Sequence, residues 1–368
     1  AHPAEQNGQS LPVHSQHQTG DTGNKRRLPF VKRRLSRRVA AIVLSVAAIL
    51  VIASSSIIWS LLHNSENGQH RQLTPTTAII QQLAFYGPGY SVVDSSGNLY
   101  VMDSDFQQTH TRILKFSSSG KLLDNWQHFT MGIHPLYVVV DKQSNIYATA
   151  QGSSMIYKLS AAGALLLKWQ VANPSGTAGT SDLQPVGLAL DKQGNLYVAV
   201  YSGNTIQKYS PAGTLLAVWG TSGNRPGQFD HPVGIAVDSD GSMYVADQGN
   251  NRIQKLSPTG TPVASWGSPG IGPGQFLQPG SIAVDTTGNV YVTDGRTGLV
   301  QQFSPSGKVL AVWGAEGSGP VQFGTPRGVA VDTTGNIYVA SVDMTGVAFV
   351  NGRITKLSST GKLLVVWK

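Results

Sequence analysis

Between residues 87 and 368, short runs rich in Val, Ile, Leu, Tyr and Trp alternate with short segments rich in Gly, Pro, Asn and Ser. Runs this short, bounded by turn-forming residues, are typical of β-strands and too short for helices. Four such runs recur in each copy of a pattern that repeats six times, so each copy is predicted to fold as a four-stranded antiparallel meander. In the fourth copy we expect strands at about 233–237, 243–246, 252–256 and 262–266.

Three residue types keep the same place in all six copies. The Asp column comprises Asp94, Asp141, Asp191, Asp238, Asp285 and Asp332; the Tyr column comprises Tyr100, Tyr147, Tyr197, Tyr244, Tyr291 and Tyr338; and the Trp column comprises Trp126, Trp169, Trp219, Trp266, Trp313 and Trp367. We interpret the Tyr and Trp columns as core and the Asp column as the start of a tight turn. Because so small a sheet cannot bury its own apolar face, the repeat predicts an all-β fold, a six-bladed β-propeller with four-stranded antiparallel blades.

The repeat resembles the NHL family of β-propellers. The clearest copy contains His231-Pro-Val-Gly-Ile-Ala-Val-Asp238, Tyr244-Val-Ala-Asp247, Asn251-Arg-Ile-Gln-Lys255 and Trp266. Copies three to six match the NHL pattern almost letter for letter, and the resemblance implies a six-bladed NHL propeller of the membrane-anchored bacterial type. Copies one and two depart from it, because Tyr90 and Tyr137 stand where the family has Gly and Ser144 replaces a turn Gly. We interpret these two copies as degraded repeats.

Two segments compete to close the ring. Leu363 to Trp367 ends the chain as a fourth strand, yet residues 79–86, followed by Gly87-Pro-Gly89, resemble a fourth strand as well. Either the early strand closes the last blade with the C-terminal strand outside it, or the reverse holds. The sequence leaves both arrangements open.

The segment before the propeller predicts a membrane anchor. Residues 39–62 carry no charge and are long enough, as a helix, to cross a bilayer core of about 30 Å. Eight Lys and Arg lie within residues 25–38, whereas residues 63–72 carry only Arg71, so the positive-inside rule predicts a cytoplasmic N-terminus and an extracytoplasmic propeller. A cleavable signal ending near Ala53-Ser54-Ser55 is the alternative. The predicted parts are a disordered basic tail at 1–38, a single transmembrane helix at 39–62, a linker at 63–76 and the propeller at 77–368.

Charge and cysteine content exclude some functions. Of the net charge of +8, residues 1–38 hold +6 and the rest of the chain only +2. Some propellers of the NHL family bind RNA through a basic face, but phosphate contacts need clustered Lys and Arg, so nucleic acid is disfavoured as a partner. Membrane lipid around residues 39–62 and anionic lipid next to the tail are the expected contacts. The chain has no Cys, which excludes a Cys nucleophile and thiolate metal sites.

A binding site is expected on one face of the ring. The loops after the second and fourth strands of each blade share that face and vary in length, and such loops usually carry binding residues. Taken singly, most polar residues there have a simpler structural interpretation, because Asn and Asp in short loops bond their own backbone. The candidates around the channel mouth are Asp103, His134, Gln184, His231, Asp247, Asn251, Arg252, Gln278, Asp294, Arg296 and Arg327, with Asp105, Asn250 and Asp343 beside them.

We therefore expect an interaction or ligand-sensing module for a protein, peptide or glycan, and neither an enzyme nor a cofactor. The alternative is a metal-dependent lyase or lactonase. Peptide-amidating lyases look similar in fold and take Zn²⁺ ligands from His residues in the loops before the first strand of a blade, but only His134 and His231 match here. Asp103, Asp247 and Asp294 could approach a divalent cation near the axis.

A third possibility is a scaffold without a small ligand. The long loop of the sixth copy contains Met344, Val347, Phe349 and Val350, and exposed apolar side chains of this kind suit a protein contact.

Overall fold

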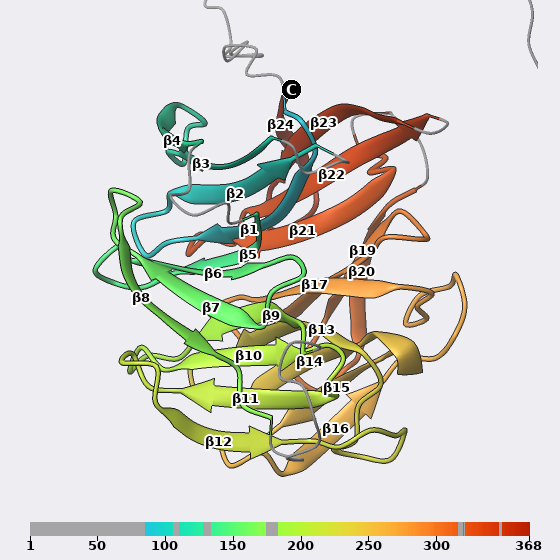
Figure 1. Cartoon of the computed structure of the whole chain (residues 1–368). Coiled ribbons are helices and arrows are strands. Elements are labelled where there is room, and N and C mark those ends of the chain that lie inside the picture. Colours follow the sequence, from blue (N-terminus) through green and yellow to red (C-terminus); the bar gives the residue numbers. More distant parts are fainter. Residues whose placement is uncertain are drawn as a thin grey trace, which may run out of the picture. The chain divides into compact units, whose positions relative to one another are not determined.

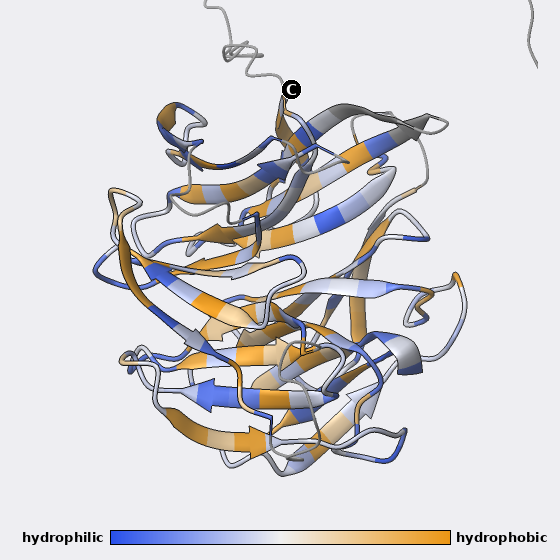
Figure 2. Cartoon of the chain, in the orientation of Figure 1, coloured by the Kyte–Doolittle hydropathy of each residue, from blue (hydrophilic) through white to orange (hydrophobic). Residues whose placement is uncertain are grey.

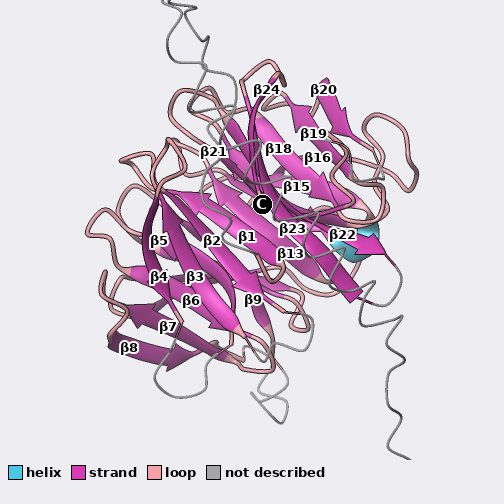
Figure 3. Ribbon diagram, turned by 90° about the horizontal axis from the view of Figure 1, so that it is seen from above, coloured by secondary structure: helices cyan, strands magenta, loops and turns pink. Residues whose placement is uncertain are grey.

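The computed structural model describes residues 85–105, 110–127, 134–173, 183–315, 319, 321–345 and 348–368. Strands dominate this part of the chain, whose one helical element is the 3-10 turn η2 at Gln248–Asn250 (Figure 3). Within it, no helix has the length and apolar character needed to cross a membrane. The predicted tail, membrane helix and linker lie outside the described residues.

In the described ranges the strands form six antiparallel sheets of four, taken in chain order. The first two blades comprise β1 (Pro88–Val93), β2 (Leu99–Ser104), β3 (Thr111–Phe116), β4 (Leu122–Trp126), β5 (Pro135–Val140), β6 (Ile146–Ala150), β7 (Met155–Leu159) and β8 (Leu165–Gln170). The next two comprise β9 (Pro185–Leu190), β10 (Leu196–Val200), β11 (Thr205–Tyr209), β12 (Leu215–Trp219), β13 (Pro232–Val237), β14 (Met243–Asp247), β15 (Arg252–Leu256) and β16 (Pro262–Trp266). The last two comprise β17 (Pro279–Val284), β18 (Val290–Asp294), β19 (Leu299–Phe303), β20 (Val309–Gly314), β21 (Thr325–Val331), β22 (Ile337–Thr345), β23 (Ala348–Leu357) and β24 (Leu363–Trp367).

The propeller prediction is confirmed. The first strand of each blade lies nearest the axis and the fourth lies outermost (Figure 1). Along the ring each innermost strand contacts the next, and β1 contacts β21, so the six blades form a closed circle. The four strands expected in the fourth copy agree with β13 to β16 within one residue. Apolar residues concentrate along the strands and polar residues at many of the turns (Figure 2).

The C-terminal strand closes the ring. β24 pairs directly with β23, so the last blade is completed by four consecutive strands. The arrangement in which residues 79–86 separate the C-terminal strand from the rest of that blade is therefore wrong. Blade six instead meets blade one through side chains, with the Trp367 and Phe116 rings stacked at 5.7 Å between centroids. Phe85 is buried in the same apolar cluster.

The Tyr column is core, as predicted, whereas in the Trp column only Trp367 is buried and the other five are half-buried against the core. Every Tyr of the column is at most 1% exposed, and each contacts the Trp of its own blade. The Trp of one blade then packs on the last turn of the next blade, where a Gly leaves room for it. At Gly307 a Cβ atom would lie 2.6 Å from Cδ2 of Trp266. Because a side chain at that Gly would clash with the indole, the repeat needs Gly there.

The Asp column opens the first turn of each blade, as predicted. Asp332 shows the pattern: Oδ1 accepts the backbone N–H of Thr334 and Asn336, and Oδ2 accepts the side-chain amide of Asn336 and the hydroxyl of Tyr338 at 3.0 Å. Burial alone would raise the pKa of Asp332, but these hydrogen bonds outweigh it and hold the pKa below its usual value. This turn therefore depends on an ionised carboxylate.

Every innermost strand contains a β-bulge directly after its Pro. In β13 the pairing with β14 runs from Pro232 opposite Asp247 to Ile235 opposite Val245, so two residues face one. The same shift occurs in the other five blades. Bulges of this kind bend the strand and re-aim the extra side chain. The residues that follow the Pro therefore occupy equivalent places at one mouth of the channel.

Candidate functional site

The central channel has a hollow at each end. One, which we call the mouth cavity, lies on the face of the long loops and holds about 420 Å³. The other, the turn-face hollow, lies among the turns that the Asp column opens and holds about 720 Å³. A narrower space of about 270 Å³ lines the channel between the innermost strands. The mouth cavity lies on the face where the sequence predicted a binding site.

The shape of the mouth cavity follows from six equivalent bulge positions, one per blade, which we call the mouth ring. In blade order they are Gly89, Leu136, Val186, Val233, Gly280 and Arg327. Blade six lies between blades five and one, so Arg327 has Gly280 on one side and Gly89 on the other. All three line the mouth cavity. The hollow forms because Gly280 and Gly89 have no side chains, and the long side chain of Arg327 between them forms part of its wall.

The chemistry of the cavity wall is polar and mostly neutral. Amides are supplied by Gln151, Gln248 and Gln278, and hydroxyls by Tyr90, Ser104, Thr293 and Thr325. Among the described residues that line the cavity, Arg327 is the one Lys or Arg and Asp105 the one carboxylate. Oδ2 of Asp105 lies 2.8 Å from Nδ1 of His110. Such a wall can hold a polar ligand by many neutral hydrogen bonds and one cation.

Arg327 is held in a partly dry position. Its burial lowers the pKa of the guanidinium from the usual value, and the nearby Tyr90 phenol opposes that shift. An arginine stays charged even so, since its pKa begins far above neutrality. A desolvated guanidinium interacts more strongly with an anion than an exposed one, because the local dielectric is lower. Burial of this cation therefore increases what it can contribute to binding.

Two tyrosines form the floor between the cavity and the channel interior. Tyr90 lines both spaces, and its ring stacks on Tyr137 with centroids 3.2 Å apart and planes at 23°. In blades three, four and six this position is Gly, and in blade five it is Ser281. A Cβ at Gly328 would strike the backbone oxygen of Gly89. Burial raises the pKa of both phenols. The two positions interpreted as degraded repeats thus shape the channel.

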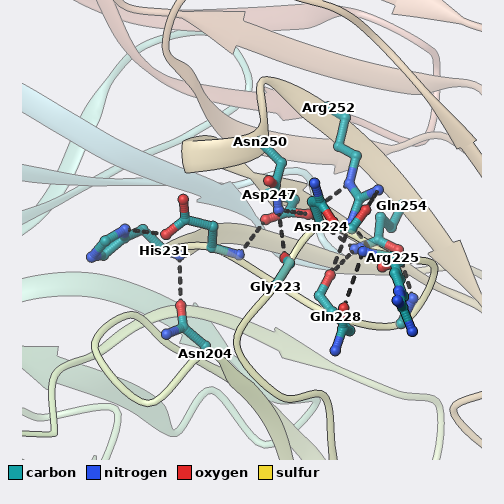
Figure 4. A network of polar contacts seen from close by, with 12 residues as sticks. Asn204, Gly223, Asn224, Arg225, Gln228, His231, Asp247, Asn250, Arg252 and Gln254 are labelled. Carbon is teal, nitrogen blue, oxygen red and sulfur yellow. Dashed lines mark hydrogen bonds and ion pairs between the residues drawn. The ribbon is translucent and has the colours of Figure 1, made fainter.

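Asp247 and Arg252 form a structural contact that holds a long loop in place, which we call a latch (Figure 4). The Asp247 side chain is fully buried and accepts the backbone N–H of Asp230 at 2.7 Å and Nε of Arg252 at 2.7 Å. Arg252 also donates to the backbone oxygens of Asn224 at 2.6 Å and Gln228 at 2.9 Å. The pair therefore fixes the long loop that leads from β12 to β13. Neither residue lines the mouth cavity.

Asp103 and Asp294 likewise accept backbone N–H groups from loops in other blades. Asp103 accepts the backbone N–H of Gly87 at 2.8 Å and Nε of Arg112 at 2.7 Å, and burial raises its pKa in spite of these bonds. Asp294 accepts the backbone N–H of Leu277 at 2.7 Å. These carboxylates hold loop backbone and do not line the cavity. Across the described ranges no group of three or more His, Asp or Glu is placed to hold a metal ion.

The remaining predicted residues lie around the rim. His231 has a positive φ of 53°, its N–H donates to Oδ1 of Asn204 at 2.7 Å, and its Nδ1 lies 2.6 Å from Oδ1 of Asp230 (Figure 4). His134 is exposed, with Nδ1 3.4 Å from the Thr111 hydroxyl. Residues that lie outside the cavity wall are His134, Gln184, His231, Asn251 and Arg296.

Of the predicted residues, Gln278 and Arg327 line the mouth cavity, and so does Asp105, which was named beside the main candidates. Tyr90, Gln151 and Gln248 were missed as site residues. The signal for Tyr90 was present in the sequence as a Tyr at a position that is Gly in three other copies. No comparable signal marked Gln151 or Gln248, which lie in ordinary turns of the repeat.

Comparison with known proteins agrees with this fold. Residues 229–256 and 276–303 match the family model of the NHL repeat. The two matched segments lie in the fourth and fifth blades. That match, together with the six-bladed propeller, supports the NHL resemblance of the sequence. A search of the curated proteins found no match.

Solved structures of similar fold include enzymes. A streptogramin B lyase is 15% identical with a TM-score of 0.55, over 79% of this chain and 85% of that chain. A virginiamycin B lyase from Staphylococcus aureus with quinupristin is 15% identical with a TM-score of 0.53, over 76% and 83%. A gluconolactonase from Xanthomonas campestris is 16% identical with a TM-score of 0.51, over 72% and 85%. Identities this low indicate a shared fold and nothing about activity.

Proposed function

We propose that this NHL-repeat propeller binds a ligand in the mouth cavity and acts as an interaction or sensing module. The observation that carries the proposal is the cavity of about 420 Å³ beside Arg327, on the face of the long loops. Ligand sites are commonly concave spaces of roughly 300–1,000 Å³ with a few placed polar groups. A protein, peptide or glycan would insert one polar group there and contact the surrounding loops.

The latches support binding by a rigid surface. The Asp247–Arg252 pair fixes one long loop, and Asp103 and Asp294 fix others, so the rim around the cavity is held in place before a ligand arrives. A preorganised site loses less conformational entropy on binding. A metal-dependent lyase or lactonase is the alternative proposal, and what favours it is the likeness in fold to lyases and a gluconolactonase.

We also propose that residues 39–62 anchor the protein in the cell membrane with the propeller outside. The support is the uncharged stretch and the eight cations that precede it. Protease treatment of intact cells expressing the chain with a C-terminal tag tests this proposal. Loss of the tag in intact cells agrees with an external propeller, and loss only after lysis contradicts it.

A plug in the cavity tests the ligand site. A Cβ at Gly89 would have the Met102 backbone oxygen as its nearest neighbour at 3.7 Å, so a side chain fits there and projects from the mouth ring. Calorimetric titration of the full chain in detergent, with a panel of peptides, glycans and organic acids, identifies ligands that bind. Gly89→Phe should abolish the binding of these ligands. Thr286→Phe, which adds the same ring at the turn-face hollow, is the control and should bind normally. Equal binding by both variants would contradict a site in the mouth cavity.

A further inference from the structure

We infer that the mouth cavity takes a small organic carboxylate and holds its carboxyl group on the Arg327 guanidinium. This inference rests on the proposed function, because it names the chemical class of ligand for the same cavity.

The backbone sets where Arg327 lies. It is the extra residue of the β21 bulge, since Pro326 pairs with Ser341 and Gly328 with Ala340 while no residue faces Arg327. Gly328 cannot take a side chain, because its Cβ would strike the backbone oxygen of Gly89. The strand is therefore held closely against blade one at this point, and the arginine projects from a rigid edge. A site on packed strands keeps its geometry better than one on a loop.

The guanidinium suits a carboxylate. Its planar fork of N–H donors matches the two oxygens of a carboxylate, and hydrogen bonds between charged groups are among the strongest in proteins. The same wall supplies neutral donors and acceptors from Gln248 and Gln278, which can bind the rest of the ligand. A single carboxyl group would leave most of about 420 Å³ empty, so the ligand has a polar body as well.

The wall favours one negative charge over two. Arg327 and Asp105 are of opposite sign, so the wall has little net charge. A phosphate dianion would gain from the arginine but would also be repelled by the nearby carboxylate of Asp105. A monoanion can place its one charged group on Arg327 and turn its neutral part toward Asp105, whose oxygens accept hydrogen bonds. This balance points to a carboxylate with hydroxyl or amide groups.

The turn-face hollow is a poorer place for an anion, although it is larger. Two of its three lysines donate to backbone: Nζ of Lys142 to the Lys192 oxygen at 3.1 Å, and Nζ of Lys158 to the Pro211 oxygen at 3.3 Å. Four carboxylates line the same hollow, one more than the three lysines; they are Asp141, Asp191, Asp238 and Asp285. The lining of this hollow therefore carries one more negative than positive charge, whereas the lining of the mouth cavity carries one of each.

Matched acid and neutral ligands test the inference on the full chain in detergent. N-acetylglycylglycine is compared with its C-terminal amide, and gluconate with glucitol, by calorimetric titration. Each acid should bind at least about tenfold more tightly than its neutral partner, which is the size expected for one charged hydrogen-bonded pair. Arg327→Met should abolish this preference. Arg296→Met, which removes a cation from an exposed place on the same face, should leave it within about twofold.

The outcomes separate the inference from the proposed function. If acids and neutral partners bind equally, and Gly89→Phe abolishes both, the mouth cavity is a ligand site but the carboxylate assignment is wrong. If the preference survives Arg327→Met, the carboxylate binds elsewhere and the inference is overturned. If neither acid binds with a Kd below about 10 mM, the carboxylate assignment fails, and the broader ligand panel with Gly89→Phe still decides the proposed function.

Discussion

Replacing Gly307 by Ala should destabilise the propeller by about 2–4 kcal/mol. Gly307 has a φ of 86°, and an L-residue in that conformation costs about 1 kcal/mol. The new Cβ would also lie 2.6 Å from Cδ2 of Trp266, so the indole must move out of its place between two blades. Overpacking of this kind costs about 1–3 kcal/mol more.

Gly194 provides the matched control. Its φ of 82° is almost the same, but a Cβ there would meet nothing closer than Cγ of Pro211 at 3.6 Å. Gly194→Ala should therefore cost only the backbone part, about 1 kcal/mol. The comparison isolates the contact between neighbouring blades.

Urea unfolding of the full chain in detergent, followed by circular dichroism, measures both variants. The account predicts a midpoint for Gly307→Ala clearly below that of Gly194→Ala, because overpacking adds to the backbone cost. Equal midpoints would refute the reasoning, since they would mean that the Trp column does not lock each blade to the next. A midpoint for Gly307→Ala equal to that of the wild type would refute the backbone part as well.

Three further predictions follow from the latches, the turns and the rim. Arg252→Met should lower the free energy of unfolding by about 3 kcal/mol, because it leaves the buried Asp247 carboxylate without its cation. Hydrogen exchange should also become faster within residues 220–231. Unchanged exchange there would contradict the role of the pair in fixing this loop. Burial would raise the pKa of Asp285, but hydrogen bonds outweigh it and lower that pKa from the usual value. The ionised Asp285 carboxylate therefore stabilises the fold above the unfolded pKa of about 3.9, and this stabilisation is lost as the pH falls through the folded pKa. Asp285→Asn should therefore lose less free energy of unfolding in acid than the wild type does. Parallel curves of that free energy against pH would contradict this prediction. Elemental analysis of the purified chain should show no stoichiometric Zn²⁺ or Ca²⁺; a bound ion lost in His231→Ala would favour the alternative enzyme.

The repeat made most of the fold predictable from the sequence. Turn residues at fixed offsets mark each strand end, so β13 to β16 were located within one residue. The Tyr column was correctly identified as core, because large rings at a constant place in each copy must pack in equivalent positions; five of the six Trp are only half-buried. Ring closure was not predictable, since residues 79–86 and the C-terminal strand have the same apolar pattern and only the pairing of β24 with β23 distinguishes them.

The candidate site was predictable in part. Loop length identified the face, but an Asp at a strand end looks the same whether it binds a ligand or, like Asp247, accepts backbone N–H groups. Arg327 could be named only as one of many candidates, because its position at the cavity depends on a bulge that is set by strand register and not by residue type. Tyr90 was visible as a large residue at a position that is Gly in three other copies, yet its stacking on Tyr137 requires neighbouring blades to be placed in space.

The central claim is that ligand binds in the mouth cavity and not at the other end of the channel. Hydrogen exchange of the full chain, measured by mass spectrometry with and without saturating N-acetylglycylglycine, tests it most directly. The account predicts slower exchange in the segments that form the cavity wall, residues 87–90, 278–281 and 325–328, with no change at 141–145 and 191–195 of the turn-face hollow. Protection confined to the turn-face segments, or spread evenly over all six blades, would contradict it.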